Sequence, residues 1–157
     1  MPELTEYQRE RLELIEHKLK FVSERPLVLC LEDAEYLKPT SHYFNDLVAL
    51  AGGKPVSLPD AEDLYTAIAE QNPDVLIIAP PSGSAVQAMG SIPQLLERLT
   101  FTVINAIKNN RIYVIDADFF VTQCPDMVDR TELLAELLYP KQFIFGYEGK
   151  GWIKFGL

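Results

Sequence analysis

Three short, continuous apolar runs constrain the fold of this chain most, because helix-like patterns separate them. The runs cover residues 27–31, 75–79 and 112–115. A run of four or five apolar residues without polar alternation is typical of a parallel strand covered on both faces. Strands that alternate with helices through short turns form a sheet with helices on both sides. We therefore predict an α/β fold, a three-layer open and mostly parallel sheet.

Amphipathic spacing and turn residues predict the helices. The first spans about residues 5–22, with Thr5 as its N-cap. Its apolar side chains are predicted to form one inward stripe: Tyr7, Leu14, Ile15, Leu19 and Val22. Further helices are predicted at 41–51, at 60–71 with acids in the first turn, at 125–139, and as two short segments between 85 and 99. Residues 1–24 are thus expected to form a linker-like helix and residues 25–157 a single lobe.

Three other segments have weaker patterns. Residues 56–58 predict a brief strand, and residues 116–123 predict a loop. Residues 101–107 fit a strand or a helix equally well.

Composition excludes several classes of function. The chain has 157 residues, which suffices for one domain with a real core. Its formal net charge of -9 opposes binding to nucleic acid, which requires clustered Lys and Arg. The same charge suits docking on a basic partner surface. No apolar run approaches the ~18 residues of a membrane-spanning helix.

The N-terminal residues contain no export signal, and the cysteines and histidines do not form a metal-binding pattern. No secretory signal is present, so the chain as written is expected to be cytoplasmic; a trimmed form of a longer chain would be periplasmic or surface-attached. Cys30 is predicted to be buried and Cys124 to lie in a loop, and their pairing stays open. His17 and His42 lie far apart and no CxxC or HExxH occurs, so neither a metal site nor a cofactor is predicted.

The candidate ligand site is the crevice outside the carboxyl ends of the strands, where open α/β sheets bind ligands. Four loops are predicted to meet there, and their aromatic side chains suit a large, flat ligand. An alternative role for Phe119 and Phe120 is to close the end of the core. The candidate ligand-binding residues are Tyr36, His42, Tyr43, Pro59, Ser82, Ser84, Phe119, Phe120 and Gln123.

Two enzymatic or signalling alternatives lack required residues. Glu32-Asp33 suggests a phospho-receiver domain, but Ala79 stands where the phosphate-accepting aspartate is needed. A serine hydrolase would use Ser82 or Ser84 with His42, yet no Gly-x-Ser-x-Gly motif occurs. We therefore predict that the protein is not an enzyme.

Several short motifs follow one another in a distinctive order. They are Arg25-Pro26 before a strand, Ala51-Gly52-Gly53, Asn72-Pro73-Asp74, Ala-Ile-Lys-Asn-Asn-Arg-Ile-Tyr at 106–113, Pro-Asp-Met-Val-Asp at 125–129, and Tyr139-Pro140. In this order, residues 25–140 resemble the C-terminal lobe of the helical-backbone solute-binding proteins of ABC importers. That group binds cobalamin, haem and ferric siderophores, and residues 5–22 resemble the rigid helix that joins its two lobes.

The resemblance implies a non-enzymatic ligand-binding module that corresponds to half of a clamp. It also implies an ABC permease as a partner, with Glu62 and Asp63 as candidate docking residues. A separate N-terminal lobe, or a homo-oligomer formed through the exposed helix, would complete the cleft. The alternative is a protein-interaction or regulatory scaffold without a small-molecule ligand.

Overall fold

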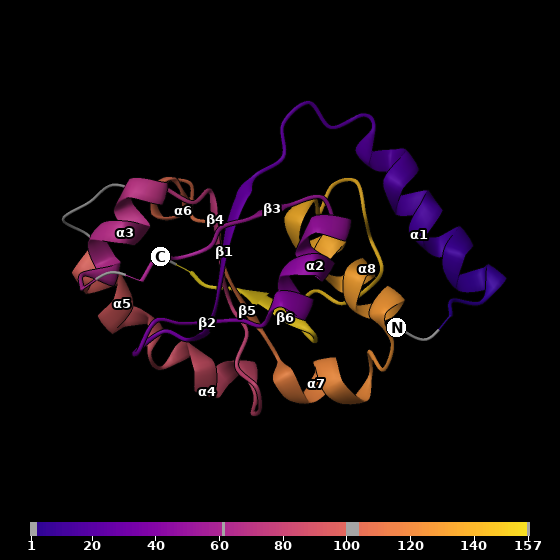
Figure 1. The fold of residues 1–157 in the computed structure, drawn as a ribbon. Helices are drawn as coiled ribbons and strands as arrows, with labels where there is room; N and C mark the ends of the chain where they lie inside the picture. Colours follow the sequence, from indigo (N-terminus) through magenta and orange to yellow (C-terminus); the bar gives the residue numbers. More distant parts are fainter. Residues whose placement is uncertain (1–2, 61, 100–103, 157) are drawn as a thin grey trace.

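The structure is a computed structural model that describes residues 3–60, 62–99 and 104–156. Its strands are β1 (Leu27–Asp33), β2 (Lys38–Pro39), β3 (Lys54–Pro55), β4 (Val75–Ile78), β5 (Ile112–Ile115) and β6 (Trp152–Lys154). Its helices are α1 (Glu6–Leu19), α2 (His42–Leu50), α3 (Leu64–Gln71), α4 (Ala85–Met89), α5 (Ile92–Leu99), α6 (Asn105–Lys108), α7 (Ala117–Thr122) and α8 (Met127–Leu138). Figure 1 shows their arrangement.

The strands form one mixed sheet that is open at both edges. Its order is β2-β1-β4-β5-β6, and β3 pairs with the first residues of β1. The pairs β1–β3, β1–β4 and β4–β5 are parallel, whereas β2 and β6 are antiparallel to their neighbours. The predicted open, mostly parallel α/β sheet is therefore confirmed.

Helices cover both faces of the sheet, so the central strands are buried on both sides. Helices α1, α2 and α8 lie on one face, and α3, α4, α5 and α6 lie on the other (Figure 1). Along β4, Val75 and Ile77 belong to the first core, and Leu76 and Ile78 belong to the second. This double burial explains why the strands have continuous apolar sequences.

Side-chain caps set the ends of several helices at the predicted places. Thr5 forms a capping box with Gln8 at the start of α1, and Ser41 caps α2. Gly52 has a φ of +100°, the left-handed conformation expected directly after a helix. Asn72 takes the same conformation at the end of α3.

Four predictions about local structure were wrong. Residues 116–123 form α7 rather than a loop, because the Asp116 carboxylate accepts the Phe119 N–H at 2.9 Å and caps a helix. The strand expected at 56–58 lies at Lys54–Pro55. Helix α3 begins at Leu64 rather than at residue 60, because Asp63 is its N-cap. Tyr7 and Leu14 do not face inward; they are 69% and 53% exposed.

The ambiguous segment 101–107 falls partly outside the described residues. Its described part ends in the helix α6. Both cysteines are buried and free, so the burial of Cys30 is confirmed.

Helix α8 joins the two ends of the chain through two buried carboxylates. The Glu136 carboxylate accepts the Trp152 indole N–H at 2.9 Å and the backbone N–H groups of residues 145, 146 and 147. These bonds replace the hydration that a buried carboxylate loses. They fix the C-terminal segment against the sheet edge, where β6 pairs with β5.

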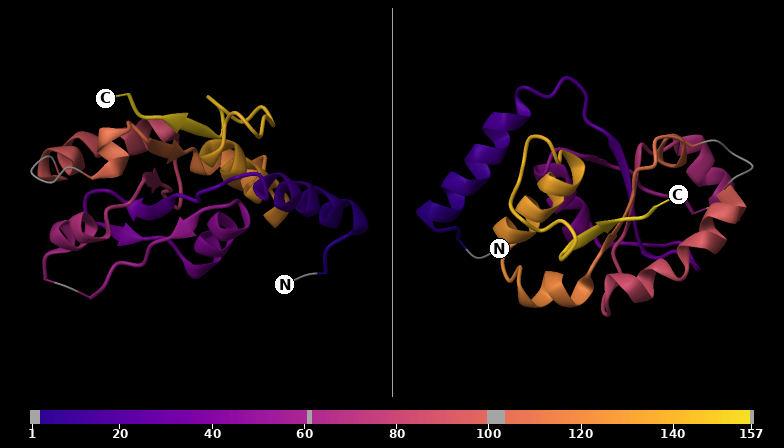
Figure 2. Two further views of the ribbon diagram at one scale, coloured as in Figure 1. Left: turned by 90° about the horizontal axis from the view of Figure 1, so that it is seen from above. Right: turned by 180° about the vertical axis from the view of Figure 1, so that it is seen from behind.

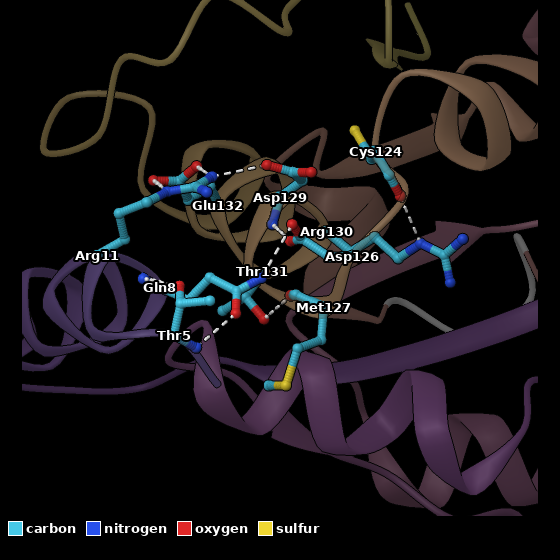
Figure 3. A network of polar contacts seen from close by, with 10 residues as sticks. All are labelled: Thr5, Gln8, Arg11, Cys124, Asp126, Met127, Asp129, Arg130, Thr131 and Glu132. Atoms are coloured by element: carbon cyan, nitrogen blue, oxygen red, sulfur yellow. Dashed lines mark hydrogen bonds and ion pairs between the residues drawn. The ribbon is translucent and has the colours of Figure 1, made fainter. Parts of the chain in front are cut away.

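The second buried carboxylate holds α1. The Arg11 guanidinium forms an ion pair with Glu132 and another with Asp129, the latter at 2.7 Å (Figure 3). Its hydrogen bonds to Glu132 hold the pKa of Arg11 above its usual range. In the same network Gln8 donates to the Asp126 carboxylate at 3.3 Å. Polar contacts therefore supplement the apolar contacts of Ile15 and Leu19 between α1 and the body.

We expect Glu136→Gln to lower the free energy of unfolding by about 3 kcal/mol, because a neutral amide cannot accept all four N–H groups. Urea unfolding followed by Trp152 fluorescence measures the change. The matched control is Glu148→Gln on the exposed part of the same segment, expected to change stability by less than about 0.5 kcal/mol. Equal effects of the two substitutions would contradict this role of Glu136.

Arg11→Met is expected to lower the free energy of unfolding by about 2 kcal/mol, because it leaves the Glu132 carboxylate without its cation. Protease cleavage after residue 20 should accelerate as α1 detaches. Arg9→Met is the control, because the Arg9–Glu3 pair is solvent-exposed and worth less than about 0.5 kcal/mol. If both variants unfold together at the same urea concentration, the α1–α8 ion pair does not hold α1.

Candidate ligand-binding site

A pocket of about 160 Å³ lies at the carboxyl ends of β1, β4 and β5. Its walls come from the start of α2, the segment after β4, helix α7 and helix α8. The side chains that define it are Glu32, Tyr43, Pro80, Phe120, Val121 and Arg130. The lining is mainly apolar, and its two charged residues are Arg130 and Glu32. This location is the crevice predicted from the strand order.

Arg130 is the charged group that gives this pocket its chemistry. Its guanidinium carbon lies 4.9 Å from the centre of the Phe120 ring, a cation–π contact. Its Nε–H donates to the Cys124 carbonyl at 2.8 Å and so fixes its orientation. Within the described part of the chain, no carboxylate lies within 4.0 Å of it as an ion-pair partner. A planar guanidinium with donors to spare suits a carboxylate or another anion.

Two candidate aromatic residues contribute directly to this pocket. Tyr43 is 41% exposed at the rim, and the Phe120 ring packs 6.0 Å from the buried Phe44 ring. Phe119 lies on the other side of α7, where its ring contacts that of Tyr147 at 5.9 Å and closes the core. Both rings thus pack against the core, and a ligand contact of Phe120, which also lines the pocket, stays a prediction.

A second, more polar pocket of about 280 Å³ adjoins the first. Glu32 and Pro80 line both pockets, and Asp33, Ser82, Gln87 and Ser91 line the second alone. Glu32 forms an ion pair with Lys38 of β2 at 3.2 Å. Ser82 is exposed at the mouth of this pocket. The edge of the sheet therefore has an apolar, cationic part and an acidic part.

The other candidate residues line neither pocket. Tyr36 is 74% exposed, His42 is exposed at the first residue of α2, and Pro59 is exposed before α3. Gln123 is the exposed C-cap of α7. Contacts of these residues with a ligand stay predictions.

Ser84 and Asp63 have structural roles as helix caps. The Ser84 hydroxyl accepts the Gln87 N–H at 3.3 Å, and the Gln87 amide oxygen accepts the Ser84 N–H in return. The Asp63 carboxylate accepts the Thr66 hydroxyl at 2.6 Å and its N–H at 3.2 Å. Both bonds lower the pKa of Asp63, and the bond from the Thr66 hydroxyl contributes most. Glu62 is exposed beside it, and docking by these two acids stays a prediction.

The sequence analysis did not identify Arg130. A usable signal exists, because a cation at the fourth residue of a helix opposes the helix dipole. Here Asp126 caps α8 and Asp129 accompanies it in the first turn, which offsets the unfavourable placement. Arg130 also contacts the Cys124 carbonyl and the Phe120 ring, and these contacts lie outside the helix pattern that the sequence shows.

The described residues contain no group of three or more His, Cys, Asp or Glu side chains placed to hold a metal ion. Over these same residues, no helix is both long and apolar enough to cross a membrane.

We expect the thiol of Cys124, whose carbonyl positions Arg130, to react slowly with a disulfide reagent at about pH 8. Burial raises its pKa to about 11, which reduces its thiolate fraction roughly 200-fold relative to an ordinary cysteine. Cys30 should be at least as inert, because burial also raises its pKa. Both thiols should react rapidly in urea, and rapid reaction of the folded protein would show that this end of the core is open.

No protein-family model matches the sequence, and no curated protein matches it. Solved structures do match the fold. A periplasmic heme binding protein from Pseudomonas aeruginosa superposes with a TM-score of 0.62 and 19% identity, over 85% of this chain and 51% of its own. The TroA-like periplasmic binding protein FepB from Veillonella parvula gives 0.57 and 15%, over 87% and 46%.

IsdE from S. aureus, complexed with heme, gives a TM-score of 0.55 and 20% identity over 83% of this chain and 54% of its own. The chain thus spans about half the length of these solved structures. At such identities the likeness shows the fold alone. For the fold, the resemblance to one lobe of these binding proteins is confirmed.

Proposed function

We propose that this chain is a non-enzymatic ligand-binding lobe for an anionic metal chelate of the haem or ferric-siderophore type. Cobalamin is retained as a further candidate ligand. In this proposal the pocket beside Tyr43, Phe120 and Arg130 forms one wall of the ligand cleft, and a second lobe supplies the opposite wall. The aromatic rings would contact the flat part of the ligand, and Arg130 would bind its carboxylate or another anionic group.

The position of Arg130 over Phe120 is the observation that supports the proposal. An apolar pocket with an oriented cation suits a planar chelate with acidic groups, and the Glu32 carboxylate in the same lining is already paired with Lys38 at 3.2 Å. The pocket volume of about 160 Å³ is below the roughly 300–1,000 Å³ of sites that enclose a ligand. Such a surface is suited to act as one half of a cleft rather than as a complete container.

The partners and the compartment belong to the same proposal. An ABC permease with a basic surface would accept the acidic residues Glu62 and Asp63 at the start of α3. The solved relatives in fold are periplasmic proteins by their names, which favours the same compartment for a lobe of this kind. The cytoplasmic location expected from the N-terminal residues stays the competing prediction.

Absorbance titration with haem, a ferric siderophore and cobalamin tests the proposal. We expect a spectral shift with at least one of them, and we expect Arg130→Gln to weaken that binding about tenfold, because the anionic group loses its cation. Arg130→Lys should retain part of the affinity through its charge.

The matched control is Arg98→Gln on α5. Arg98 also stacks on an aromatic ring, that of Tyr65 at 5.3 Å, but on the helices that cover the opposite face of the sheet. The Arg98→Gln substitution should leave the affinity for the ligand unchanged. No shift with any of the three ligands would favour the alternative, an interaction scaffold that binds no small molecule. Equal losses in both arginine variants would remove Arg130 from the site.

A further inference from the structure

Glu32, which lines both pockets, has a carboxylate oxygen that no group in the described part of the chain contacts as a donor. Its Oε2 lies 3.2 Å from the Lys38 ammonium, and Oε1 accepts no hydrogen bond from the described residues. The Glu32 side chain is only 24% exposed, so water replaces little of the missing hydration. A carboxylate accepts about four hydrogen bonds. Glu32 can therefore accept further bonds from a ligand.

Two other carboxylates at this edge of the sheet are occupied by backbone groups. Asp33 accepts two N–H groups of its own turn, at 2.7 and 3.2 Å. Asp116 accepts one N–H from the start of α4 at 3.2 Å and one from α7 at 2.9 Å. These two helices lie side by side at the edge in Figure 1, and the view from behind in Figure 2 agrees. Asp33 and Asp116 thus stabilise the fold, whereas Glu32 makes no such bond.

Neither nearby cation uses up the capacity of Glu32. The Lys38 side chain is 69% exposed, and an ion pair with so exposed a partner is screened by water and contributes little. Arg130 lines the same pocket, but within the described residues no carboxylate lies within 4.0 Å of its guanidinium. The pocket therefore contains a cation and a carboxylate that are not paired with each other.

We propose that the ligand carries an N–H donor beside its anionic group, and that Glu32 binds this donor while Arg130 binds the anion. The inference rests on the proposed function and deepens it by naming a chemical class, an anionic chelate with amide or amine groups. A carboxylate forms its stronger hydrogen bonds with such donors because the acceptor is charged. The donor would lie where the apolar pocket adjoins the more polar one, since Glu32 lines both.

This chemistry separates the candidate ligands. Cobalamin carries an anionic phosphodiester and primary amides, whereas the periphery of haem carries carboxylates and no N–H donor at neutral pH. A carboxylate of the ligand is repelled beside Glu32, and an amide is bound there. We therefore expect a chelate with amide groups to bind more tightly than haem.

Absorbance titration of Glu32→Gln with cyanocobalamin and with haem tests the role of Glu32. We expect the substitution to weaken the binding of cyanocobalamin about fivefold, because the amide N–H loses a charged acceptor. Haem should bind as well as before or more tightly, because a negative charge beside its carboxylates is removed. A purely structural role of Glu32 would change both affinities in the same direction.

Two control variants separate the carboxylate from its ion pair and from the net charge. Lys38→Gln breaks the same ion pair but leaves the carboxylate, so it should not weaken the binding of cyanocobalamin. Glu70→Gln removes an exposed carboxylate near the end of α3 and should change neither affinity. Circular dichroism verifies that each variant folds.

The outcomes distinguish this inference from the proposed function. If neither chelate binds, the proposed function fails and the inference fails with it. The inference alone is overturned if binding depends on Arg130 while Glu32→Gln weakens both chelates equally or changes neither. It is also overturned if haem binds to the wild type more tightly than cyanocobalamin, or if Lys38→Gln weakens cyanocobalamin binding as much as Glu32→Gln does.

Discussion

The position of both chain ends depends on the polar partners of two carboxylates buried on one helix. On α8, Glu132 is paired with Arg11 from the N-terminal helix, and Glu136 accepts four N–H groups from the C-terminal segment. A buried carboxylate without such partners is strongly unfavourable. Removing either end of the chain would therefore leave an unpaired charge beside the core. On the sheet face covered by α1, α2 and α8, polar contacts therefore hold the elements together in addition to the apolar contacts.

The same helix connects this framework to the pocket. Its first turn holds the cap residue Asp126, which accepts a hydrogen bond from Gln8 of α1, and its fourth residue is Arg130 (Figure 3). The Cys124 carbonyl, just before the helix, orients the guanidinium toward Phe120. The Arg130 side chain at the sheet edge thus belongs to α8, in which nine of twelve residues are buried. A rigid support of this kind would suit the proposed binding of an anionic group.

The sequence predicted those features that depend on a few neighbouring residues. Continuous apolar runs predicted β1, β4 and β5, and Ser41, Gly52 and Asn72 marked helix ends through their own backbone and capping chemistry. Strand β3 was not predicted, because it has only two residues and their backbone pairing leaves no side-chain pattern. Glu132 and Glu136 have the spacing of surface acids, and only the folded chain brings Arg11 and residues 145–152 to them. Arg11 and Glu132 are 121 residues apart in the sequence, so no local pattern connects them.

A pocket lies at the predicted edge of the sheet, but the residues that line it were predictable only in part. Strand order determines the edge, and this order follows from the alternation of strands and helices. Which loop residues face the pocket depends on whether a segment is helical: once 117–122 forms α7, Phe120 turns toward the pocket and Phe119 toward Tyr147. Arg130 lies in a helix that the sequence assigned to the core. Its place near the N-terminal end of α8 runs against the helix dipole. Its contacts with the Cys124 carbonyl and the Phe120 ring lie outside the helix, so no helix pattern could indicate them.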